Sequence, residues 1–508
     1  MPLRFDLTTI SHFANPSIAS GCIKLLKVAV SRATDSDSES PLGYEYGMLC
    51  ISIIISCLDL CLLERLDELE ETLVIGDKTP ELPTCMTFST IAAREIFNQL
   101  VTLSGIEDYE WSGSANHRRC TPLLAPQDAL DLMNMLWDDR WFLLMDFGLS
   151  SIFFALFQYI SHEYHSRKNP NGTTLYNQLY ELIIRSLVAA NKRDQSVALR
   201  ILAECGEYTD WTPTSKHTDV LDSQLIMTAF IRQISQGLDS KALNLEPESP
   251  LKMLQFVALA TDPGSQDLLP KVIECTINIG WSWLLDQDDQ IELSPDLLFD
   301  ALGMLIKPVH TPPYQLLPSV QAQIIDTLRS TDFLDLTAQL ILRLDPTKPD
   351  ITIVTFDCML YFYQSLEDAV SRFALGQKFW DYVPVWRKFK NHLYTNHYGM
   401  TSVINSERDD HFRLCMKHWF LFARLVGLEP AIRNSADDEF VVNVRKQSTV
   451  MLDVKRWTGG LGAVLFPVLG CVDAIWVSLI SEGSRRRKSL QNLAQIILHF
   501  YARISLAL

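Results

Sequence analysis

Apolar side chains recur at three- and four-residue spacing through most of this 508-residue chain. That spacing is the signature of amphipathic helices, whereas strands alternate every second residue. Alternating runs are few and short, such as residues 350–354 and 441–444, and both of these also suit the start of a helix. Polar segments rich in proline and glycine separate stretches long enough for helices of about 12–25 residues. The pattern predicts an all-α fold of stacked antiparallel helices, as an irregular solenoid or an α–α superhelix.

Proline marks where some of these helices should begin. In Ser294-Pro295-Asp296 and Asn15-Pro16-Ser17, a capping residue precedes a proline at the first helical position. Residues 126–136 and 295–305 echo each other, since both begin with proline and close with Met-Leu. No repeat period is exact, so the repeats would be degenerate.

The alternation of predicted helices with short polar breaks resembles degenerate armadillo or HEAT stacking. Two short segments, Gly43-Tyr44-Glu45-Tyr46-Gly47 and Leu136-Trp137-Asp138-Asp139-Arg140, resemble the helical regions of large families of uncharacterised fungal proteins. Some members of those families carry a MYND-type zinc finger. The paired CxxC pattern of that finger is absent from this sequence, so the resemblance implies no zinc role.

The formal net charge of −17 disfavours binding to nucleic acid, because phosphates repel an acidic surface. The charge is uneven: residues 376–508 hold 18 Lys/Arg against 11 Asp/Glu, and residues 1–375 hold 26 against 50. We therefore expect an acidic helical-repeat region at 1–375 and a basic helical region at 376–508 packed on it. The basic end would suit an anionic partner, or would be an ordinary solvated face.

The eleven cysteines form no CxxC pair, and three of them, Cys50, Cys57 and Cys61, share one helical stripe in an apolar run. Such cysteines are typical of core residues in a reducing compartment. The first residues also lack a signal-peptide profile. These features predict a cytoplasmic protein, with the nucleus as the alternative.

One apolar stretch, residues 459–480, is long enough to cross a membrane. Asp473 is its only charge, and a carboxylate is costly within the hydrocarbon layer. Pro467 and three glycines near the start suggest a loop that leads into a shorter, buried helix. We favour buried core and keep membrane association through 459–480 as the alternative.

Motifs for catalysis and cofactors are missing or incomplete. No P-loop occurs, and Leu465 occupies the third glycine position of a dinucleotide-binding turn that would begin at Gly460. The segment 148–152 lacks the second glycine of a nucleophile elbow. In 162–165 the two histidines are three residues apart, not the four a zincin needs. We predict a non-enzymatic protein without a cofactor.

His411, Cys415 and His418 are the most specific metal-ligand set, since their spacing places all three on one helix face. Ligands at both ends would be about 10 Å apart along the helix, too far for one ion. No fourth ligand is signalled either. The alternative is a core cysteine between two partly exposed histidines, and no metal site is predicted.

Two basic segments are candidate binding sites. Residues 378–390 interleave aromatic and basic side chains, a combination that suits an anionic or phosphorylated partner. The candidates there are Lys378, Trp380, Trp386, Arg387, Lys388 and Lys390. Alternatively, Trp386, Phe389 and Leu393 form a core stripe with the bases outside. The second segment is Arg485, Arg486, Arg487 and Lys488.

Together these features predict a helical scaffold that binds a protein or peptide partner, because helical stacks offer long surfaces for recognition. Membrane association is the runner-up. A third class is an enzyme whose site carries no motif.

Overall fold

The computed structural model describes most of the first 430 residues of the chain. The described ranges are 12–33, 42–72, 84–104, 122–145, 148–167, 172–206, 219–239, 249–285, 295–307, 315–399 and 406–429. The chain divides into two compact units, Met1–Pro430 and Ala431–Leu508, and every described residue belongs to the first. The boundary that charge suggested at 375/376 falls inside a helix, because a change of surface charge need not coincide with a break in packing.

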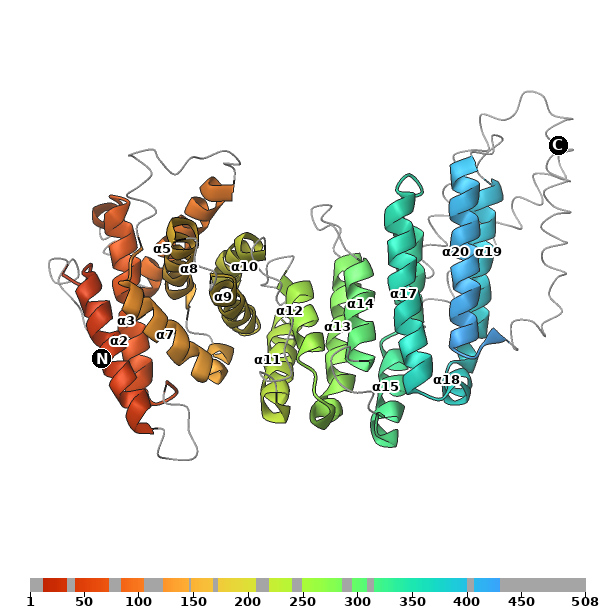
Figure 1. Ribbon diagram of the computed structural model, residues 1–508. Helices are drawn as coiled ribbons and strands as arrows, with labels where there is room; N and C mark the ends of the chain where they lie inside the picture. Colours follow the sequence, from red (N-terminus) through yellow and green to blue (C-terminus); the bar gives the residue numbers. More distant parts are fainter. Residues whose placement is uncertain are drawn as a thin grey trace, which may run out of the picture. The chain divides into compact units, whose positions relative to one another are not determined.

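Helices account for nearly all of the described residues, and no strand occurs among them (Figure 1). The first are α2 (Pro16–Ala33), α3 (Glu45–Arg65), α5 (Thr84–Ser104), α7 (Pro126–Asp138), η1 (Arg140–Leu144), α8 (Ser150–Arg167), α9 (Gly172–Leu187) and α10 (Lys192–Gly206). Next come α11 (Val220–Asp239), α12 (Ser249–Leu259), η2 (Pro263–Leu268), α13 (Leu269–Leu285), α14 (Pro295–Ile306), α15 (Pro318–Ser330) and α16 (Phe333–Arg343). The last are α17 (Pro349–Ala369), α18 (Arg372–Lys378), η3 (Trp380–Tyr382), α19 (Val383–Gly399) and α20 (Ser406–Leu425). The prediction of an all-α helical stack is confirmed.

Local sequence signals explain several helix starts. Both α2 and α14 begin at the proline that the sequence marked, and the Asn15 side chain accepts a hydrogen bond from the Ser17 amide at 3.0 Å. The alternating run 350–354 is helical, since it lies within the first turns of α17. A proline at the first position of α17 favours this outcome.

In the second half of the described chain, each helix packs on a helix that follows it after one to three intervening helical segments. In one series α12 packs on α14, α14 on α17, and α17 on α20 (Figure 1). In the other, α11 packs on α13, and α13 on both α15 and α16. The approach of α14 to α17 is tight at Gly303, where an added Cβ would lie 2.5 Å from the Tyr361 ring. The Tyr361 ring would have to shift to admit a side chain at this position, so the close approach of the two helices favours glycine.

Aromatic rings fill the core where α14, α16 and α17 meet. Phe333 lies 5.8 Å from Phe299 and 5.1 Å from Phe362, measured between ring centroids. Tyr363 extends this cluster toward α20, where its ring stacks on Phe422 at 4.5 Å. Tilted and stacked pairs at these distances add to the free energy gained by burial.

One described helix, α3, is long and apolar enough to cross a membrane by length and composition alone. It is mostly buried against α2, α5 and α8, which is the environment of a core helix. Its single interior acid, Asp59, is 3% exposed. The stretch 459–480 lies outside the described residues.

Candidate functional site

Phe373 and Trp380 are the most exposed aromatic side chains in the described part of the chain. Phe373 of α18 is 79% exposed, and Trp380 of η3, seven residues later, is 60% exposed. Between them Lys378 donates from Nζ to Asp326 Oδ1 of α15 at 2.8 Å. We call Phe373, Lys378 and Trp380 the aromatic surface. It includes two of the binding residues that the sequence predicted.

Polar contacts attach η3 to the helices beneath it. Arg329 of α15 donates from Nη2 to Asp381 Oδ2 at 2.6 Å, and the Tyr382 hydroxyl donates to Asp332 Oδ1 at 2.8 Å. Burial, followed by the nearby Asp332 carboxylate, raises the pKa of Tyr382, so its phenol stays a donor. Trp380 is thus presented from a turn that these two contacts hold in place.

Trp386 is buried, so its prediction as a binding residue is wrong. Its side chain is 1% exposed and stacks on Trp419 of α20, with ring centroids 3.7 Å apart and planes at 13°. Phe389 packs on the same Trp419 ring at 4.4 Å. Helical periodicity turns this stripe inward, so the core alternative for Trp386, Phe389 and Leu393 holds.

The remaining bases of 378–390 lie at or near the surface of α19. Lys388 is exposed, whereas Arg387 and Lys390 are half-buried. Lys390 places its Nζ 5.4 Å from the centroid of the Phe420 ring, a cation–π distance. The segment therefore combines a buried aromatic stripe with an outer basic face. Arg485, Arg486, Arg487 and Lys488 lie outside the described residues.

The three predicted metal-ligand candidates lie on one face of α20 but do not converge on one point. His411 Nε2 and Cys415 Sγ are 3.5 Å apart, whereas His418 stacks its ring on Phe356 of α17 at 4.3 Å. Its Nδ1 donates to the Leu414 carbonyl at 2.9 Å. Burial raises the pKa of Cys415 to about 12, which disfavours the thiolate that a metal needs. Among the described residues, no group of three His, Cys, Asp or Glu is placed to hold a metal ion.

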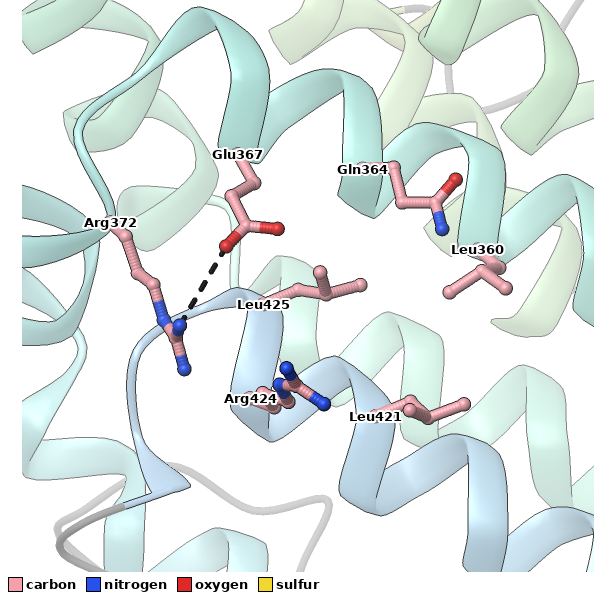
Figure 2. A pocket seen from close by; sticks show the side chains of 7 residues that line it. All are labelled: Leu360, Gln364, Glu367, Arg372, Leu421, Arg424 and Leu425. Atoms are coloured by element: carbon pink, nitrogen blue, oxygen red, sulfur yellow. Dashed lines mark ion pairs between the residues drawn. The ribbon is translucent and has the colours of Figure 1, made fainter.

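A pocket of about 270 Å³ lies between α17 and α20, beside the start of α18 (Figure 2). Its lining residues are Leu360, Gln364, Glu367, Arg372, Leu421, Arg424 and Leu425. Three leucines supply apolar walls: Leu425 is central in Figure 2, with Leu360 and Leu421 to its right, and Arg372 and Glu367 lie on the opposite side. Arg372 pairs with Glu367 at 3.9 Å and with Glu429 at 3.6 Å. No sequence motif marks this pocket, because its lining comes from three helices.

A second concentration of polar groups is buried where α3, α5, α8 and α10 meet. Asp59 of α3 faces Asp194 and Arg193 of α10, and burial raises the pKa of Asp59 to about 7. The Ser151 and Ser89 hydroxyls and the Arg193 charge oppose that rise. Ser150 donates to Asp194 at 2.5 Å. These contacts join four helices within the core, which is the arrangement of a structural cluster.

Phe373 and Arg424 are surface residues absent from the candidates that the sequence predicts. Helical spacing gave no signal for Phe373, because α18 ends at Lys378 and Trp380 belongs to the separate segment η3. Nothing in the sequence marked Arg424, because its importance comes from the pocket beside it, which two other helices help to line. The chain matches no protein-family model, no curated protein and no solved structure. The class of protein is therefore set by the fold alone: an all-α helical stack.

Proposed function

We propose that this protein is a non-enzymatic helical scaffold that binds a protein or peptide partner through the aromatic surface. The observation that supports this most is the exposure of Phe373 and Trp380, at 79% and 60%. Large aromatic side chains are common energetic anchors of protein interfaces. Leaving two of them in water on one short segment has a cost that a partner would remove.

Two ion pairs that hold the segment carrying these aromatic rings favour binding. The pairs Lys378–Asp326 and Arg329–Asp381 are exposed and contribute little to stability individually. They do restrict the orientation of α18 and η3 before any partner arrives. Less conformational freedom is then lost on association, which raises affinity.

Proximity labelling with the full chain as bait tests this proposal. We expect wild type to label a reproducible set of proteins, and a Phe373→Ser/Trp380→Ser double variant to lose part of that set. The matched control is Leu285→Ser on α13, since Leu285 is apolar and 72% exposed but lies outside the aromatic surface. Identical labelling by all three chains would refute the aromatic surface as the binding site.

A further inference from the structure

The first two described helices, α2 and α3, present apolar side chains to solvent on one side. Leu25 and Val28 of α2, and Tyr46 and Leu49 of α3, are each about half-exposed. Gly21 lies one turn before Leu25, and a Cβ added to it would meet nothing within 4 Å. We call these five residues the α2/α3 outer face. Helices at the end of a stack normally turn a polar side outward, so an apolar outer face indicates a surface that something covers.

The outer face is continuous across the two helices, which pack directly on each other (Figure 1). Tyr46 forms a hydrogen bond with Cys50 of its own helix and lies close to Cys22 of α2, which places Tyr46 at the boundary between the helices. Leu25 is one turn from Cys22, and Leu49 is one turn from Tyr46. Residues one turn apart share a helix face, so these side chains extend the surface to either side of the boundary.

Other helices occupy the remaining sides of the pair. Ser20 Oγ donates to Asp128 Oδ2 of α7 at 2.6 Å, and Lys27 Nζ donates to Asp131 Oδ2 of α7 at 2.7 Å. Leu25 points about 150° away from these two positions of α2, at roughly 100° per residue. The far sides of α3 pack on α5 and α8. The outer face is therefore the side of the pair that the described helices leave in solvent.

Serines beside the outer face add little polarity, because their hydroxyls donate within their own helices. Ser52 Oγ donates to the Met48 carbonyl at 2.8 Å. Ser56 Oγ donates to the Ser52 carbonyl at 2.9 Å, and Ser31 Oγ donates to the Lys27 carbonyl at 2.7 Å. Covering a hydroxyl that already donates leaves no unpaired donor behind, so burial of this surface carries a small polar cost.

Lys24 and Glu45 lie at opposite edges of the outer face. Both are exposed, and neither side chain takes part in a hydrogen bond or ion pair with the described residues. At about 100° per residue, Lys24 lies about 160° round α2 from Cys22, and Glu45 lies about 140° round α3 from Cys50. Cys22 and Cys50 interact where the helices meet, so the two charges lie on the outer edges of the pair.

The two helices are almost neutral in a strongly acidic chain. Together α2 and α3 hold four Lys/Arg against three Asp/Glu, whereas the whole chain carries −17. Two acidic molecules repel each other least where their surfaces are neutral. A surface with one free base at one edge and one free acid at the other is also complementary to itself, which is what contact between two identical copies requires.

We propose that two copies of this chain associate through the α2/α3 outer face, with α2 of each copy packed on α3 of the other. A two-fold axis parallel to the helices gives this arrangement, because rotation about it exchanges the two edges of the face. Lys24 of each copy then meets Glu45 of the other, and both residues lie within two turns of the level of the Cys22–Cys50 contact. The inference is independent of the proposed function, since it concerns a different surface.

Sedimentation velocity of the full chain, from about 1 to 100 µM, tests this inference. We expect wild type to shift from monomer to dimer as concentration rises. Leu49→Arg should weaken the dimer about tenfold or more, because the interface would bury an unpaired charge. The matched control is Leu285→Arg on α13, which changes an exposed leucine outside the outer face and should leave association unchanged. Circular dichroism checks that both variants keep the helix content of wild type.

Charge reversal tests how the two copies are arranged. Lys24→Glu alone and Glu45→Lys alone each turn two attractive pairs of the dimer into repulsive ones, so each should weaken association by about fivefold or more. The double variant Lys24→Glu/Glu45→Lys should restore association. An equal mixture of the two single variants should form a heterodimer more tightly than either variant associates with itself, because every facing pair is then a lysine with a glutamate.

Four outcomes would overturn the inference. A wild type that stays monomeric throughout, or that associates no better than Leu49→Arg, would remove the outer face as a dimer contact. Single variants that do not favour each other in the mixture would contradict the two-fold arrangement. Association lost in Phe373→Ser/Trp380→Ser but kept in Leu49→Arg would place the contact on the aromatic surface. A monomeric wild type that binds phosphatidylcholine vesicles, when Leu49→Arg does not, would assign the outer face to a lipid surface instead.

Discussion

The described helices from α3 to α12 bury charged groups as well as aromatic rings, whereas those from α15 to α20 bury aromatic rings and keep their carboxylates, lysines and arginines outside the core. In the first region Arg185 is fully buried between Glu181 and Asp222. In the second the bulkiest buried side chains are Trp386 and Trp419, which stack on each other. Ion pairs such as Arg329–Asp381 lie on the surface there.

The kind of side chain that is buried affects how the sequence determines the packing of the helices in each region. A buried ionic cluster needs its partners at defined positions, so it fixes which helices meet and in which register. Stacked rings contribute through area and dispersion and leave the polar side chains free to face solvent. The α15–α20 region can therefore vary its surface without disturbing its core, which suits a binding function.

The largest effect is expected from Arg185→Ala. Arg185 donates to both carboxylate oxygens of Asp222, at 2.7 and 2.8 Å, and lies 5.6 Å from the Phe256 ring centroid. Its loss removes the closest counter-ion of two buried carboxylates, which costs about 3–5 kcal/mol. Urea unfolding followed by circular dichroism measures this, with exposed Arg94→Ala as the control. A loss below about 1 kcal/mol would show that the cluster does not fix the helices.

A loss of similar or slightly smaller size is expected from Trp386→Ala. Removing a buried tryptophan leaves a cavity against Trp419 and costs about 3–5 kcal/mol. Trp380→Ala should change the free energy of unfolding by no more than about 0.5 kcal/mol, because its ring is mostly in solvent. The same urea experiment compares them. Equal losses in the two variants would mean that Trp380 is also part of the core.

Trp386 and Trp380 show which features of the structure can be predicted from the sequence and which cannot. Periodicity alone predicts the helices and places Trp386 on a core stripe, because the pitch of a helix is a local property. It does not reveal that Lys378 pairs with Asp326, 52 residues earlier, or that the Arg424 side chain has no partner among the described residues. Pairing depends on which helices become neighbours, and that information is not local. Helix content is therefore predictable here, whereas the pairing of surface charges is not.

Asp59→Asn probes the buried polar cluster of α3, α5, α8 and α10. Asp59 has a folded pKa of about 7, against 3.8 ordinarily, so the folded chain holds a proton that the unfolded chain releases first. Stability of wild type should fall as pH rises from about 4 to 7 and stay reduced above that range. Each pKa unit is worth about 1.4 kcal/mol, which gives up to roughly 4 kcal/mol.

The asparagine cannot ionise, so the difference in unfolding free energy between Asp59→Asn and wild type isolates this group from others. We expect this difference to favour the variant least at pH 4 and increasingly toward pH 8. Urea midpoints at five pH values provide the measurement. A difference that stays flat with pH would mean that Asp59 is ionised in the folded chain throughout that range.

The smallest effect on stability is expected at the Arg329–Asp381 pair. Both side chains are about half-exposed, at 44% and 58%, so a double-mutant cycle with alanine should give a coupling of about 0.2–1 kcal/mol. The pair nevertheless holds η3, and its removal lets Trp380 sample more orientations before binding. Partner labelling should therefore weaken in Arg329→Ala although the urea midpoint barely moves. Intact labelling would mean that the turn keeps its geometry through Tyr382 and Asp332 alone, and that surface ion pairs in this region are dispensable for recognition.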